Sequence, residues 1–131
     1  MGVTRKLIKQ GNGTDKPKKG DEVIIEYTGN LYDSSVGPEN DFRGKPFDSS
    51  VGRGDFKTQI GVGKVIQGLD EGVMEMTVGE KSILTISADY AYGDQGFPGF
   101  IPPNTTLIFK VELKAINGKE VEIQDSQGEG S

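Results

Sequence analysis

Residues 105–116 read Thr-Thr-Leu-Ile-Phe-Lys-Val-Glu-Leu-Lys-Ala-Ile, and this stretch decides the fold more clearly than any other. Leu107, Phe109, Val111 and Leu113 occupy every second position, and mostly polar side chains lie between them. Successive side chains of a strand point to opposite faces of a sheet, so a period of two predicts a strand with one face on the core. The pair Asn117-Gly118, which is typical of a tight turn, follows directly.

Other strands are predicted upstream from shorter patterns. Residues 21–31 alternate in the same way, with Val23, Ile25 and Tyr27 on one face. Four further candidates are less regular, and they lie at residues 3–10, 47–50, 55–60 and 80–87. Residues 30–46 have no clean period and contain Gly37-Pro38, which predicts a long loop or a loose hairpin.

One helix is expected, and it falls between Val65 and Met76. Apolar residues recur there at three- and four-residue spacing, at Ile66, Leu69, Val73 and Met76. Gly68 and Gly72 weaken the helix by about 1 kcal/mol each relative to Ala, so tertiary packing must stabilise it.

Strands in number with a single short helix indicate the α+β class. We expect a twisted antiparallel β-sheet of about five strands wrapped around one short α-helix. The helix also carries the carboxylates Asp70, Glu71 and Glu75, which are interpreted as a solvated face.

The length of 131 residues fits one domain. We expect this domain to span residues 1–118, with an extended loop at 30–46, and a polar C-terminal tail at 119–131 that is disordered towards its end. A repeat marks the extended loop, because Asp33-Ser34-Ser35-Val36-Gly37 recurs fifteen residues later as Asp48-Ser49-Ser50-Val51-Gly52. Two copies are too few for a solenoid, so a local duplication that lengthened the loop is the preferred interpretation.

Composition excludes several classes of function. The chain has no Cys and no His, which removes the usual ligands of zinc, copper and haem, the Cys and His nucleophile–base pairs, and disulfides. We therefore expect neither a metal nor a cofactor. A net charge of −5 disfavours nucleic acid and anionic membranes as partners. No secretory signal is recognisable in residues 1–20, so a cytoplasmic location is expected. No feature of the sequence indicates an oligomer, so a monomer is expected, with self-association through the duplicated loop left open.

Two short motifs are discounted. Arg53-Gly54-Asp55 spells an integrin-binding tripeptide, but without a secretory signal it is interpreted as chance in a turn. Gly61-Val62-Gly63-Lys64 looks like part of a phosphate loop, yet no Ser or Thr follows the lysine and the earlier glycine is missing. Neither motif is expected to bind a ligand.

The aromatic residues carry the functional signal, because several lie beside Gly, Pro or Asp in predicted loops. Four ordered blocks of residues carry a further signal: residues 23–29 (Val-Ile-Ile-Glu-Tyr-Thr-Gly), 47–50 (Phe-Asp-Ser-Ser), 63–73 and 90–107. From about Val3 to Ile116 the chain resembles the FKBP family of peptidyl-prolyl cis-trans isomerases.

The resemblance implies a pocket between the sheet and the helix. Its walls would be Tyr27, Phe47, Phe56, Val65, Ile66, Phe100, Ile101 and Phe109. Leu69 would form the floor, where the family usually has Trp, and Phe97 would lie on the rim. Asp48 and Tyr92 would make polar contacts, the Ile66 N–H would bind a substrate carbonyl, and Tyr27, Asp48, Tyr92 and Phe109 would act on the rotating bond.

The resemblance also implies partners. The substrates would be proline-containing peptides and proteins, and the ligands would include the macrolides tacrolimus and rapamycin. Calcineurin or TOR kinase would be a possible partner of the drug complex.

Other interpretations of the same residues stay open at this point. Tyr27, Val65 and Phe109 also fit a plain core role, and Asp48 fits an Asx turn with Ser50. Because Leu69 replaces the usual Trp, a non-catalytic module that only holds proline-containing segments stays open as an alternative to an isomerase. A hydrolase with paired carboxylates is disfavoured, because no Asp or Glu pair lies beside a plausible nucleophile.

Overall fold

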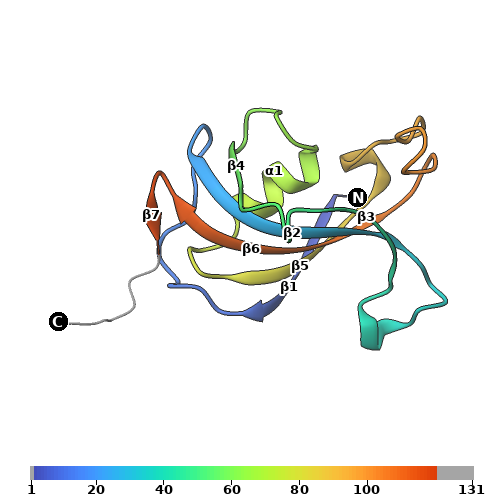
Figure 1. Ribbon diagram of the computed structural model, residues 1–131, viewed down its shortest axis with the longest axis horizontal. Coiled ribbons are helices and arrows are strands. Elements are labelled where there is room, and N and C mark those ends of the chain that lie inside the picture. The colour runs from blue at the N-terminus through green and yellow to red at the C-terminus, as the bar shows by residue number, and fades with distance from the viewer. Residues whose placement is uncertain (1, 121–131) are drawn as a thin grey trace.

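The computed structural model describes residues 2–120 and contains one antiparallel sheet. Its strands are β1 (Val3–Lys9), β2 (Glu22–Tyr32), β3 (Arg43–Ser49), β4 (Phe56–Gln59), β5 (Lys81–Ile86), β6 (Leu107–Ile116) and β7 (Lys119–Glu120). Their order is β1-β5-β6-β2-β3, with β4 also paired to β2 and β7 to β6. Helix α1 (Gln67–Met74) lies over one face of the sheet (Figure 1), and two short 3₁₀ helices, η1 (Pro38–Asn40) and η2 (Ala88–Tyr90), lie in loops.

The predicted α+β class and the single helix are confirmed, although the described residues form seven strands rather than about five. Strand β6 lies between β5 and β2, which places the clearest alternating segment in the middle of the sheet. Its Leu107, Val111 and Leu113 have no exposed surface. The sequence pattern succeeded here because a central strand buries one complete face.

Helix α1 approaches the sheet very closely, and its two glycines explain how. A Cβ atom at Gly68 would lie 2.3 Å from Cγ2 of Ile86, and one at Gly72 would lie 2.7 Å from Cδ1 of Leu84. Both β5 side chains are fully buried. The glycines that lower helix propensity therefore permit the contact between helix and sheet that stabilises α1.

The prediction of a solvated carboxylate face on α1 is wrong for one of its three residues. Glu71 and Glu75 are exposed, but Asp70 is only 7% exposed. Its carboxylate accepts hydrogen bonds from the N–H groups of Gly61 at 2.8 Å and Gly63 at 2.9 Å. A buried carboxylate needs such donors, and no local sequence pattern indicates that these two amides converge on it.

The extended loop is shorter than predicted, because strands take up both of its ends. β2 continues to Tyr32 and β3 begins at Arg43, which leaves residues 33–42 as the loop of a hairpin. This loop lies on the side of the sheet away from α1 (Figure 1), where the Lys6 ammonium of β1 contacts the Asp41 carboxylate at 2.7 Å. Ile83 and Ile108, which belong to the same outer face, are 4% and 1% exposed.

The start of the predicted tail is ordered into structure. Lys119 and Glu120 form β7 and pair with the end of β6, and Asn117-Gly118 makes the predicted turn between them. The remaining tail residues lie outside the described part of the chain. Within residues 2–120, no helix has the length and apolar character needed to cross a bilayer.

Candidate functional site

A hollow of about 230 Å³ opens between the end of β3 and the loop that precedes β6. Six residues line it, all of them in the predicted site: Phe47, Asp48, Tyr92, Phe97, Phe100 and Ile101. Three Phe rings, a Tyr ring and an Ile make most of its wall apolar, and Asp48 is the one charged residue among the six. The structure therefore brings together side chains from two segments more than forty residues apart in the sequence.

A chain of ring contacts connects this hollow to the sheet. Tyr27 packs edge-on against Phe56 at 5.7 Å between centroids and lies 6.1 Å from Phe109. Phe109 in turn meets Phe47 in a T-shaped contact at 5.5 Å. Gly29 makes room for them, since a Cβ atom there would lie 2.7 Å from the Phe47 ring and 2.8 Å from the Phe109 ring. Gly29 is a site residue that the sequence analysis did not single out.

The rim of the hollow is a tight turn at Phe97-Pro98-Gly99-Phe100. The Phe100 N–H donates to the Phe97 carbonyl at 2.9 Å, and Phe97 and Ile101 exchange two further backbone hydrogen bonds. Pro at the second position and Gly99 at a φ of 87° at the third are typical of a type II turn. The turn stacks the Phe97 and Phe100 rings at 5.4 Å while leaving 48% and 59% of these residues exposed. The two rings therefore form an exposed apolar loop tip at the rim.

Asp48 is the centre of a polar network beside the rings. The Tyr27 hydroxyl donates to Oδ2 at 2.9 Å, and the Arg53 guanidinium binds Oδ1 at 2.9 Å. The alternative Asx turn with Ser50 is wrong, because the Ser50 N–H donates to the Tyr27 carbonyl instead. Arg53 was set aside as part of a chance tripeptide, yet here it neutralises the carboxylate at the site.

Both tyrosine hydroxyls of the site stay protonated near neutral pH. Burial, followed by the hydrogen bond to Asp48, raises the pKa of Tyr27 to about 12. Burial, with a smaller contribution from the Asp48 charge, also raises the pKa of Tyr92. The Tyr27 proton is already engaged by Asp48, whereas the Tyr92 hydroxyl has no hydrogen-bond partner within residues 2–120. Tyr92 is therefore the side-chain donor available to a ligand.

A second hollow of about 370 Å³ adjoins the first on the other side of Asp48. Tyr27 and Phe56 line it together with the turn that carries Arg53. The remaining predicted wall residues and the predicted floor residue line neither of these two hollows. The floor residue Leu69 and the wall residue Phe109 are buried in the core, and Val65 and Ile66 are half-buried against it. For Phe109 the core role and the ring contact with Phe47 hold at once.

Ile66 nevertheless has the free donor that the resemblance implied. It is the N-cap residue of α1, and its carbonyl accepts from the N–H groups of Leu69 and Asp70. Its own N–H makes no hydrogen bond with any residue between 2 and 120. The first N–H groups of a helix lack intrahelical partners, so such a donor is ready for a ligand carbonyl.

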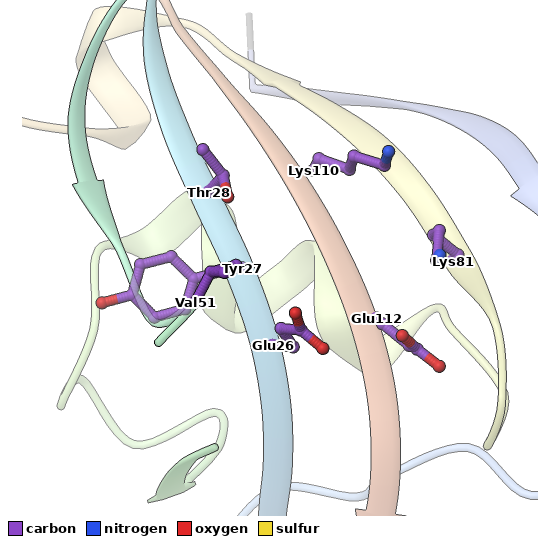
Figure 2. A pocket seen from close by; sticks show the side chains of 7 residues that line it. All are labelled: Glu26, Tyr27, Thr28, Val51, Lys81, Lys110 and Glu112. Carbon is purple, nitrogen blue, oxygen red and sulfur yellow. The ribbon is translucent and has the colours of Figure 1, made fainter. Parts of the chain in front are cut away.

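A third hollow, on the face of the sheet opposite α1, has a different character. It measures about 170 Å³ and is lined by Glu26, Tyr27, Thr28, Val51, Lys81, Lys110 and Glu112. Figure 2 shows Glu26, Lys110 and Glu112 projecting from neighbouring strands into this region. Charged and polar groups make up most of the lining, so it offers little to an apolar ring.

Comparison with known proteins shows the family of the chain. Residues 13–114 match the family of FKBP-type peptidyl-prolyl cis-trans isomerases. The chain belongs to this family.

Its similarity to individual members is high and covers nearly their whole length. It is 57% identical to "FK506-binding protein 1B" of Emericella nidulans over 85% of this chain and 92% of that protein. It is 57% identical to "FK506-binding protein 1A" of Aspergillus fumigatus, with 91% and 98% covered. It is 54% identical to "Peptidyl-prolyl cis-trans isomerase" of Schizosaccharomyces pombe, with 92% and 99% covered. The protein is thus an isomerase of the bond that precedes proline rather than a hydrolase or a non-catalytic module that only holds proline-containing segments.

Proposed function

We propose that the hollow lined by Phe47, Tyr92 and Phe100 is the place where this isomerase binds the proline of its substrate. The observation that carries the proposal is the apolar ring wall with a free phenol donor at its edge. Aromatic faces pack well against a proline ring, and a donor at the edge can hold the neighbouring carbonyl.

The physical task of the site is to lower a rotational barrier. Amide resonance makes the peptide bond planar and opposes rotation by about 18–20 kcal/mol. Before proline the cis and trans forms are close in energy, yet they interconvert only in tens to hundreds of seconds. Twisting the bond breaks the resonance and leaves a less polar amide. An apolar cavity disfavours the planar ground state relative to the twisted one, which is where catalysis must act.

Each predicted residue has a role in this proposal. Phe47, Phe97, Phe100 and Ile101 grip the proline ring, and the Tyr92 hydroxyl and the Ile66 N–H hold carbonyl oxygens while the bond turns. Tyr27, Phe56 and Phe109 hold Phe47 and Asp48 in position, and Val65 and Leu69 pack in the core at the start of α1. Arg53 keeps the Asp48 carboxylate paired, so that no bare charge faces the apolar wall.

Macrolide binding belongs to the same proposal. Relatives named FK506-binding proteins, at 57% identity over most of the chain, support tacrolimus as a ligand of this hollow, and rapamycin as a second one. The drug complex would then present a combined surface to calcineurin or TOR kinase. The natural substrates would be proline-containing proteins in the cytoplasm, and the protein would act on them as a monomer.

Kinetics on an X-Pro peptide with matched variants test the proposal. Phe47→Ala removes a ring contact worth up to about 1.5 kcal/mol, so kcat/KM should fall about tenfold. Phe100→Ala should lower kcat/KM and weaken rapamycin inhibition. Leu7→Ala is the control, because Leu7 is an apolar side chain of similar exposure, 52% against 59%, on distant β1. Equal activity in all three variants would refute the assignment of the hollow.

A further inference from the structure

The segment between β4 and α1 carries a motif whose role the hollow does not explain. Gly61-Val62-Gly63-Lys64 precedes the helix in the manner of a phosphate loop, and Gly61 and Gly63 both have a φ of 82°. Successive N–H groups in such turns form a concave nest that binds anions. In this protein the anion comes from the chain itself, because the Asp70 carboxylate accepts from both glycine amides.

Asp70 also holds the other end of the same segment. Its backbone N–H donates to the Ile66 carbonyl at 3.1 Å, while its side chain binds residues 61 and 63 at 2.8 and 2.9 Å. One residue thus clamps the segment 61–66 at both ends. Lys64 and Val65, which lie between the clamped points, make no hydrogen bond with other residues of the described chain.

The clamp is stronger than a surface contact would be. Asp70 is only 7% exposed and makes no ion pair within residues 2–120, so its charge is compensated by the two amides and the N-terminal end of α1. Hydrogen bonds to an ionised acceptor are about twice as strong as neutral ones. The buried carboxylate therefore fixes the backbone that leads into Ile66, whose N–H makes no hydrogen bond within residues 2–120.

We propose that Asp70 is a positioning residue for isomerisation, which acts by holding the Ile66 N–H where a substrate carbonyl meets it. This inference rests on the proposed role of Ile66 in binding that carbonyl. Neutralising Asp70 without changing its shape should release the Gly61–Gly63 amides and let the segment shift.

Asp70→Asn is the direct test, since Asn can accept from one amide but presents an N–H₂ group to the other. We expect kcat/KM on an X-Pro peptide to fall about tenfold, the loss that one ordinary hydrogen bond represents, and the amide NMR signals of Gly61, Gly63 and Ile66 to move together. Glu71→Gln is the matched control, because it removes the same charge from the next residue of α1, which is exposed. Equal kcat/KM and an unmoved Ile66 signal in the two variants would overturn the inference.

Two further measurements keep the result unambiguous. In the wild-type protein, the Gly61 and Gly63 amides should exchange with solvent at least tenfold more slowly than that of Gly118, an exposed turn glycine with no acceptor within residues 2–120. If Asp70→Asn does not fold, amide exchange of the wild-type protein is measured again with rapamycin bound. Stronger protection of the Gly61 and Gly63 amides supports the link between the Asp70 hydrogen bonds and ligand binding at Ile66, and unchanged protection overturns it. Failure of the proposed hollow is recognised separately, because Phe47→Ala would then also leave kcat/KM unchanged.

Discussion

Replacing Gly68 by Ala sets two effects in this fold against each other. Gly68 lies in the second position of α1, and Ala is the better helix former by about 1 kcal/mol. On helix propensity alone the variant should be more stable. The structure predicts the reverse, because the new methyl group has no space.

The size of the steric cost follows from the contacts. A Cβ atom at Gly68 would lie 2.3, 2.9 and 2.9 Å from three carbons of Ile86. Ile86 is fully buried, so it cannot turn away into solvent. Overpacking a core by one methyl group costs about 1–3 kcal/mol, and three short contacts to one rigid side chain indicate the upper end of that range. After subtracting the gain in propensity, we expect a net loss of about 2 kcal/mol.

Urea unfolding followed by circular dichroism measures this difference. Gly72→Ala provides the graded comparison, because its nearest contacts to Leu84, at 2.7, 3.2 and 3.4 Å, are longer and the loss should be smaller. Ile86→Ala should relieve the clash, so the double variant with Gly68→Ala should be more stable than the two single losses add up to. A more stable Gly68→Ala, or strictly additive effects, would refute the close-packing explanation of the glycines.

Three more predictions concern pH and the pocket floor. The pKa of Tyr27 is raised to about 12, so the contribution of its protonated hydroxyl to stability is complete below pH 10 and is lost as the pH rises towards 12. Tyr27→Phe should therefore flatten the fall in the free energy of unfolding between pH 10 and 12. An unchanged slope in this variant would count against the buried phenol. Burial alone would raise the pKa of Glu80, but hydrogen bonds from Ser82, Thr77 and Arg5 outweigh burial and hold that pKa below 4.5. The protein should therefore lose stability as the pH falls below 4.5. Glu80→Gln should cost about 1–3 kcal/mol at pH 7 and weaken this acid dependence, unlike the exposed control Glu75→Gln, and equal behaviour of the two would contradict the network. Leu69 is only 7% exposed in the core and stands where the resemblance implies a Trp floor, so Leu69→Trp should tighten tacrolimus binding and change kcat/KM; a variant with neither change would remove Leu69 from the account.

Much of the fold could be predicted because burial in a sheet leaves a period of two in the sequence. β6 shows that period over its whole length and was predicted within two residues. β2 was predicted within one residue at each end, although Gly29 and Asn30 are weak strand formers. Pairing overrides that preference there, with Gly29 opposite Phe109 and Asn30 opposite Ile108 on β6.

The aromatic residues of the candidate site could be predicted from the sequence, but the residues that hold them in position could not. Phe97, Pro98, Gly99 and Phe100 carry a local turn signal, so their exposure could be read directly. Arg53, Gly29 and Asp70 act on partners from other strands or loops, and no local pattern marks such contacts. A carboxylate on a short helix is usually solvated, and only the folded chain brings the Gly61 and Gly63 amides to Asp70.

The most direct test of the central claim combines exchange and mapping in one NMR experiment. Wild-type protein, labelled with ¹⁵N, is added to an X-Pro peptide, and cis–trans exchange peaks and amide shifts are recorded together. We predict exchange far faster than the uncatalysed rate, with the largest amide shifts at Phe47, Tyr92, Phe100 and Ile101. Accelerated exchange with shifts at Glu26, Lys110 and Glu112 on the opposite face would contradict the assigned site, and no acceleration would contradict the isomerase itself.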